Sequence, residues 1–174
     1  MTDTNHEILE FGQKEQEWEV VVPWITAILY NPNTGLFGCI HDTKNPWDYW
    51  LICWWKNGNE DPIICAKREV QEETWYYDFT SIEPIVDVLY SRYYHPKKKN
   101  HFRWIVNPYL IIMKSLKTRE TWLEEHEIWF EPIRTTVQAI KDSLNTTWAK
   151  RFGEWCYDHH LFLLDKVKEM VEKY

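Results

Sequence analysis

Runs of β-branched and aromatic residues in the first third of the chain predict a small antiparallel sheet. Residues 20–30 (VVVPWITAILY) have the pattern of a buried strand, and a turn at 31–35 separates them from an expected partner strand at 36–41. A second turn, DTKNP, precedes a short apolar strand at 49–53.

After residue 60 the hydrophobic period changes from two to that of a helix. Asp61 suits an N-cap, and the proline after it suits the first helical position, where its missing N–H leaves nothing unpaired. Ile63, Ala66 and Val70 follow at steps of three and four residues and are therefore expected to share one face. The pattern predicts a helix over about 62–74 that packs on the sheet.

The second half of the chain alternates between strand-like and helical patterns. The pattern predicts strands at 82–94, 102–116 and 128–130, and helices at 136–144 and 155–174. The C-terminal helix has an apolar face of Leu161, Leu164, Val167 and Val171. Strands on both sides of a central helix predict an α/β fold, a mixed β-sheet flanked by helices.

Length and composition favour one globular domain. A chain of 174 residues suits a single domain over 1–174, in which 1–18 form a polar N-terminal segment. No apolar run approaches the roughly 18 residues of a membrane span, and the N-terminal segment has no apolar signal region. We therefore expect a cytoplasmic protein with no membrane partner.

Charge and cysteine spacing exclude further classes of protein. The formal net charge of -7 disfavours broad nucleic-acid binding, which makes RNA an unfavoured partner. The four cysteines contain no CxxC pair, so neither a zinc ribbon nor a disulfide framework is expected. We expect buried free thiols instead.

One segment of the predicted helix concentrates negative charge. Glu69, Glu72 and Glu73 lie three and four residues apart, so their carboxylates can converge beside the helix. A solvated acidic face is the ordinary explanation of such a run. The upstream spacing argues against that explanation, because Arg68 precedes the run directly and Glu60 lies eight positions before Arg68.

This spacing resembles the signature of the Nudix hydrolase family, G-x(5)-E-x(7)-R-E-U-x-E-E-x-G-U, in which U is aliphatic. Every charged position of the signature is matched. The signature falls on Trp54, Glu60, Arg68, Glu69, Val70, Glu72, Glu73, Trp75 and Tyr76. The resemblance implies a Nudix-type α/β/α sandwich that hydrolyses a nucleoside diphosphate linked to a moiety X, a nucleotide or nucleotide-sugar-like substrate.

The resemblance also implies roles for individual residues. Glu69, Glu72 and Glu73 would hold Mg²⁺ or Mn²⁺, for which carboxylates are suitable hard ligands. Arg68 would orient a carboxylate, and Glu60 would hold the preceding loop against the helix. Nudix enzymes often dimerise, so a homodimer is possible.

The general base varies within this family. It is either a glutamate of the signature, such as Glu69 or Glu72, or a glutamate from a later loop. Glu124, Glu125 and Glu127 precede the predicted strand at 128–130, and Glu127 is our choice by position. An exposed acidic turn is an equally good explanation of this trio.

Both signature glycines are replaced by tryptophan, at Trp54 and Trp75, and the whole chain has 12 Trp but only 5 Gly. A left-handed conformation at a helix end is cheap only for Gly, so Trp75 would be strained there. We hypothesise that a codon read as Gly in the source organism, UGA being the obvious candidate, is rendered here as Trp. The alternative to recoding is a degenerate signature with weakened catalysis. The alternative to an enzyme is a catalytically silent Nudix-fold binding module.

A dense basic turn lies between the strands predicted at 82–94 and 102–116. Lys97, Lys98 and Lys99, flanked by Arg92 and Arg103, could clamp substrate phosphates or RNA, although a solvated hairpin tip is the simpler interpretation. The turn also loosely resembles Nudix domains associated with class I aminoacyl-tRNA synthetases, which leaves an accessory role of that kind open.

Overall fold

The computed structural model describes residues 8–95, 97–118, 130–148 and 157–174. The strands are β1 Leu9–Gly12, β2 Val20–Asn31, β3 Leu36–Asp42, β4 Asn45–Trp50, β5 Ile52–Trp55, β6 Phe79–Pro84, β7 Leu89–His95, β8 Asn100–Met113 and β9 Phe130–Thr135. The helices are α1 Pro62–Thr74, α2 Val137–Ser143 with the π-helical turn Leu144–Trp148, and α4 Asp158–Val171.

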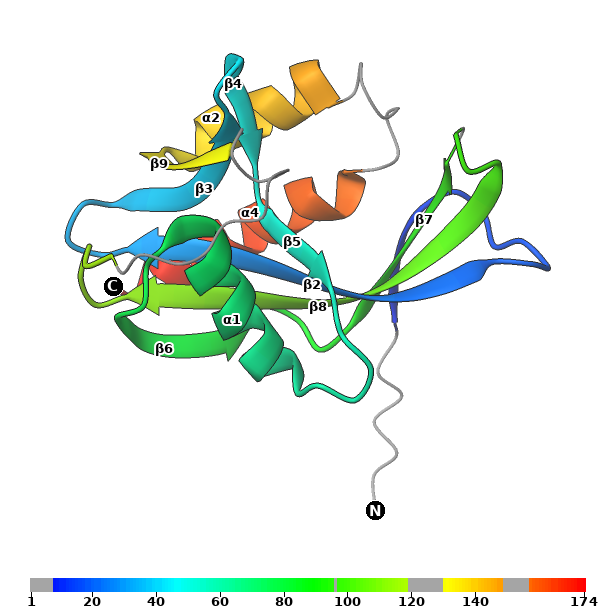
Figure 1. Cartoon of the computed structure of the whole chain (residues 1–174), viewed down its shortest axis with the longest axis horizontal. Coiled ribbons are helices and arrows are strands. Elements are labelled where there is room, and N and C mark those ends of the chain that lie inside the picture. The colour runs from blue at the N-terminus through cyan, green and yellow to red at the C-terminus, as the bar shows by residue number, and fades with distance from the viewer. Residues whose placement is uncertain (1–7, 96, 119–129, 149–156) are drawn as a thin grey trace.

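These strands form a mixed sheet with the main order β1-β7-β8-β2-β3-β4. Strands β2 and β8 pair in parallel over 11 positions at its centre, and β1 also pairs with β7 in parallel. The other pairings are antiparallel, including β5 with β2, β6 with β8 and β9 with β3. Helix α1 covers one face, and α2 and α4 cover the other (Figure 1).

Alternation along β2 divides its side chains between two cores. Ile25, Ala27 and Leu29 pack with α1, whereas Ile28 and Tyr30 pack with α2 and α4. This division follows from the period of two in a strand. The prediction of an α/β fold with helices on a mixed sheet is therefore confirmed. Among the described residues, no helix has the length and apolar character that a membrane crossing requires.

Several predictions about strands are wrong, because pairing partners are chosen by residues far away in the chain. The strand predicted at 128–130 overlaps the observed β9, Phe130–Thr135, only at its first residue. Residues 49–53 are not one strand: the chain leaves β3 as a partner and joins β2, so β4 and β5 are separated at Leu51. Residues 82–94 are divided into β6 and β7, which pair with opposite halves of β8. The polar segment 1–18 contains β1, which is placed by its parallel pairing with β7.

The buried faces of the helices also differ in detail from the prediction. Ile63 is 39% exposed and lines a shallow groove beside β6, instead of joining the core that Cys65, Ala66 and Val70 form with the sheet. In α4, Leu164 and Val167 are buried as predicted. Leu161 and Val171 are only partly buried, and Leu163, which was not predicted, is completely buried.

Candidate metal centre

Helix α1 carries the predicted carboxylates, and its N-terminal end is fixed locally. Asp61 Oδ1 accepts hydrogen bonds from the backbone N–H groups of Ile63 at 2.9 Å and Ile64 at 3.1 Å. This is the N-cap predicted from the sequence. Cys65, Ala66 and Val70 of the same helix are completely buried against the sheet, which sets the direction in which the remaining side chains of α1 point.

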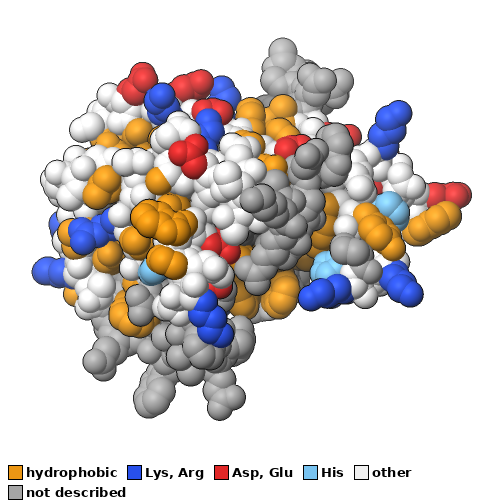
Figure 2. Space-filling view, turned by 90° about the horizontal axis from the view of Figure 1, so that it is seen from above, with side chains coloured by type: hydrophobic (Ala, Val, Ile, Leu, Met, Phe, Trp, Pro, Cys, Tyr) orange, Lys and Arg blue, Asp and Glu red, His pale blue; other side chains and the backbone are white. Residues whose placement is uncertain are grey.

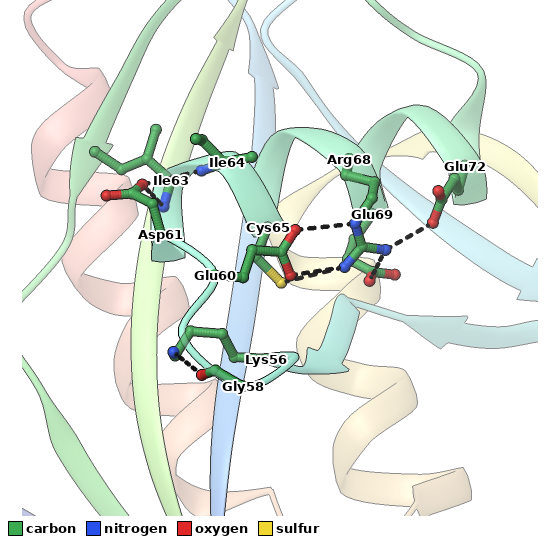
Figure 3. Close-up of polar contacts among 10 residues, drawn as sticks. All are labelled: Lys56, Gly58, Glu60, Asp61, Ile63, Ile64, Cys65, Arg68, Glu69 and Glu72. Carbon is green, nitrogen blue, oxygen red and sulfur yellow. Dashed lines mark hydrogen bonds and ion pairs between the residues drawn. The ribbon is translucent and has the colours of Figure 1, made fainter.

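Arg68 is the centre of an ion-pair cluster at the side of α1 (Figure 3). Its Nε and Nη2 atoms donate to the two carboxylate oxygens of Glu60 at 3.1 and 3.0 Å, a bidentate geometry. Its Nη1 atom donates to Glu72 Oε2 at 3.0 Å and also contacts Glu69 Oε1. One guanidinium group therefore connects the loop before α1 to two carboxylates on the helix.

The carboxylates of this cluster differ strongly in exposure. The side chain of Glu69 is 3% exposed and that of Glu72 is 44% exposed. Burial raises the pKa of Glu69 to about 7; Arg68 opposes this shift, and the charges of Glu72 and Glu73 add to it. The hydrogen bonds from Arg68 lower the pKa of Glu60. The cluster thus holds one buried carboxyl group that resists ionisation beside further acidic groups.

The chemistry of this cluster fits a divalent cation. Carboxylate oxygens are the ligands that Mg²⁺ and Mn²⁺ prefer, and Glu69 Oε1 is buried without a hydrogen bond of good geometry, although Arg68 Nη1 is in contact. In the described part of the chain, no three His, Cys, Asp or Glu side chains already surround one point. Glu69 and Glu72 are both directed at Arg68, so their rotamers would have to change to bind an ion.

Cys65 takes part in the cluster, which the sequence analysis did not predict. Arg68 Nη2 lies 3.6 Å from Cys65 Sγ, and burial, followed by the charge of Glu60, raises the pKa of the thiol to about 12. The spacing of three residues between Cys65 and Arg68 is the signal that could have indicated this contact. The expectation of buried free thiols is confirmed for Cys39 and Cys65. Cys53 is free but only partly buried, and Cys156 lies outside the described residues.

Trp75 ends α1 in the left-handed conformation expected for the second signature glycine. Its φ and ψ angles are 64° and -2°, and its backbone N–H donates to Gln71 O at 3.0 Å. Among the described non-glycine residues, only Trp75 and Lys99 have a positive φ. A side chain costs of order 1 kcal/mol or more in this conformation. The backbone at position 75 therefore favours glycine, as the recoding hypothesis requires.

We predict that Trp75→Gly raises the free energy of unfolding by about 1 kcal/mol, because relief of the left-handed strain outweighs the lost packing of a half-buried indole. Urea titration measures this change. Trp47→Gly is the matched control: Trp47 lies in β4 and is 77% exposed, so its replacement should lower stability slightly. Equal destabilisation by both substitutions would contradict the strain argument.

Trp54 occupies a different kind of position. It lies in β5, pairs with Ile25 of β2 and is half-buried, and its indole lies 5.3 Å from that of Trp55, measured between ring centroids. Its backbone lacks a positive φ, so backbone conformation does not demand glycine here. A glycine at this position of the signature lets a ligand approach the backbone closely. The side chain of Trp54 obstructs that approach.

The structure does not bring the basic turn to the carboxylates. The β7–β8 hairpin that carries Lys97, Lys98 and Lys99 projects away from α1 (Figure 1), and the three lysines are exposed. Arg103 lies 3.7 Å from Glu15 and 3.6 Å from Glu19 in ion pairs. A phosphate-binding role for these four residues stays a prediction. Glu124, Glu125 and Glu127 lie outside the described residues.

Comparison with known proteins supports the fold and not the detailed chemistry. No family model and no curated protein sequence matches this chain. Among solved structures, the NUDIX domain of Shewanella oneidensis NrtR, complexed with ADP ribose, is 10% identical with a TM-score of 0.55, over 88% of this chain and 90% of that one. A putative NUDIX hydrolase from Listeria monocytogenes is 15% identical with a TM-score of 0.54, over 86% and 94%. The chain therefore has a Nudix-type α/β fold, in agreement with the resemblance read from residues 54–76.

Proposed function

We propose that this protein is a metal-dependent hydrolase that cleaves the diphosphate linkage of a nucleoside diphosphate joined to a moiety X. The observation that carries the proposal is the ion-pair cluster of Arg68 with Glu60, Glu69 and Glu72, because all four residues occupy charged positions of the signature. The Nudix-type fold supports the same conclusion.

The residues of this cluster have separable tasks in the proposed reaction. Glu69, Glu72 and Glu73 would hold Mg²⁺ or Mn²⁺, which when bound supplies charge neutralisation at the diphosphate and activation of water. Arg68 keeps the carboxylates of Glu69 and Glu72 on one side of the helix, and its bidentate bond to Glu60 fixes the loop that precedes α1. Water oxygen bonds to phosphorus as the bridging P–O bond breaks, and the water gives up a proton, so the products are a nucleoside monophosphate and the phosphate of X.

The substrate class is proposed from the neighbour structure. The Shewanella oneidensis domain is complexed with ADP ribose, a nucleoside diphosphate joined to a sugar. A nucleotide sugar of this type is therefore the first substrate to test. The net charge of -7 gives this chain little general attraction for a polyanion, which favours a small substrate held by a cation over RNA.

A panel of nucleotide sugars and dinucleoside polyphosphates with Mg²⁺ or Mn²⁺ tests the proposal through release of the two phosphate-bearing products. We expect turnover of at least one compound that stops with a chelator and falls at least about 100-fold in Glu72→Gln. Glu169→Gln is the matched control, since Glu169 lies on α4 in an exposed pair with Lys166. Metal-independent turnover, or unchanged activity in Glu72→Gln, would refute the assignment.

A catalytically silent binding module is the second candidate. The left-handed Trp75 and the indole at Trp54 favour it, because both differ from the glycines of the signature. Calorimetric titration with ADP-ribose distinguishes the two candidates. Binding without turnover in both the present chain and a Trp54→Gly/Trp75→Gly variant supports the module, whereas turnover that appears only in the glycine variant supports an impaired enzyme.

A further inference from the structure

Two adjacent histidines of α4, His159 and His160, are buried where this helix packs on the sheet. Their exposed fractions are 0% and 2%, and their ring centroids lie 4.0 Å apart. Neither ring nitrogen of His159 has a hydrogen-bond partner among the described residues. Buried polar groups in this state are uncommon in proteins, so the pair needs an explanation that packing alone does not provide.

Described residues of three strands face the pair. His160 Nε2 lies 3.5 Å from Cys53 Sγ of β5, and Thr26 of β2 lies 3.6 Å from the same sulfur. The ring of His159 lies edge-on to Trp104 of β8, with 6.0 Å between centroids. These three facing groups carry no negative charge.

Two ion pairs of α4, Lys141–Asp165 and Lys166–Glu169, lie on its exposed side. Asp158 precedes the pair of histidines in the chain. The contact between α4 and β1 is aromatic, with ring centroids of Phe11 and Phe162 5.1 Å apart. At its contacts with Cys53 and Trp104, a proton added to either buried ring would therefore meet neutral side chains, and it would also meet the positive end of the α4 helix dipole.

We propose that the His159–His160 pair is a pH-sensitive latch, which holds α4 on the sheet while both rings are neutral and releases the helix when they are protonated. Release uncovers the apolar face of Leu163, Leu164 and Val167. It also removes the cover from β5, the strand that leads into the loop before α1. Protonation of the two histidines would therefore affect β5, which helps to position the candidate metal centre on α1.

Burial determines the direction of this switch. It lowers the pKa of His160 to about 3 and that of His159 well below its ordinary value of 6.5, with His160 adding to the effect on His159. In a released helix both histidines would have ordinary pKa values. They would therefore bind protons at a pH at which the histidines of the packed helix stay neutral. The packed state is therefore fully favoured above pH 6.5 and loses stability as the pH falls below 6.5, by about tenfold per pH unit for each histidine.

Hydrogen exchange of the whole protein, measured by mass spectrometry at pH 7.5 and 5.0 and corrected for intrinsic exchange rates, tests the latch. The opening constant of α4 amides should rise roughly 1,000-fold at pH 5.0, and only about 30-fold in His159→Phe or His160→Gln. His101→Gln on the β7–β8 hairpin is the control and should behave as wild type.

Two outcomes would overturn the proposal. One is exchange in α4 that does not depend on pH beyond the intrinsic rates. The other is an equal rise of the opening constant in β2, which would indicate global unfolding instead of release of α4. If the variants fail to fold, ¹⁵N-imidazole NMR of the wild type decides: protonation of both buried rings near pH 6.5 while α4 amides stay protected would also refute the latch.

Discussion

Glu69→Gln is expected to lower kcat/KM for a diphosphate substrate at least 100-fold, roughly the smallest effect of removing an essential carboxylate from a hydrolytic site. Glu69 is the most deeply buried carboxylate of the cluster and is contacted by Arg68. An amide of the same shape retains the packing but offers an ion only one neutral oxygen. Steady-state kinetics with the substrate identified by the nucleotide panel, over a range of Mg²⁺ concentrations, measures the loss.

The free energy of unfolding of Glu69→Gln shows whether its loss of activity is caused by misfolding. Because the pKa of Glu69 is raised to about 7, the metal-free folded state binds a proton between pH 4.5 and 7 that the unfolded chain releases. This carboxyl group therefore costs stability progressively as the pH rises through that window. Without metal at pH 7.5, the free energy of unfolding of Glu69→Gln should be equal to that of wild type or higher by up to about 3 kcal/mol, as measured by urea titration. A variant that is both inactive and markedly less stable would contradict this account.

Arg92→Met is expected to lower the free energy of unfolding by about 3–5 kcal/mol, the cost of removing one partner from a buried ion pair. The side chains of Arg92 and Glu19 are 3% and 5% exposed, and Arg92 Nε lies 3.0 Å from Glu19 Oε1. Arg92 Nη1 also pairs with Glu10 Oε2 of β1 at 3.0 Å. Without the guanidinium group, the carboxylate of Glu19 would be buried without its main partner.

A second substitution tests whether uncompensated charge is the cause. The double variant Arg92→Met/Glu19→Gln removes both buried charges and leaves only the more exposed Arg103 and Glu10 nearby, so most of the lost stability should return. Arg103→Met is the matched control on the neighbouring strand. Arg103 is 27% exposed with longer ion pairs, and its replacement should cost no more than about 1 kcal/mol. If Arg92→Met and Arg103→Met lowered the free energy of unfolding equally, an uncompensated buried charge would not explain the effect of Arg92→Met.

Features encoded by residues close together in the chain were predicted well. The N-cap at Asp61, the length of α1 and the strand from Val20 needed only local periodicity and turn chemistry. The cluster of Arg68 with Glu60, Glu69 and Glu72 could be located because its members lie on one helix and the loop that enters it. Even the left-handed backbone at Trp75 followed from the family pattern alone.

Pairing between distant segments is where sequence reasoning failed. The polar segment at the N-terminus contains a strand, β1, only because β7 is available to pair with it. Arg92, interpreted from the sequence as one flank of an exposed basic patch, is buried because Glu10 and Glu19 lie beside it in the folded sheet. Strand pairing joins residues far apart in the chain, so no local pattern reports it.

By itself, the amino-acid sequence determined the α/β class, the helix that bears the carboxylates, and the spacing that relates them to Arg68. Only the tertiary structure decided which of those carboxylates is buried, that Arg68 gathers them, and that two histidines of α4 lie against Cys53 and Trp104. The physical reason is that the pKa of a side chain depends on its burial and on its neighbours in space. Periodicity along a chain reports which residues share a face, but the partner of that face is chosen by the whole fold.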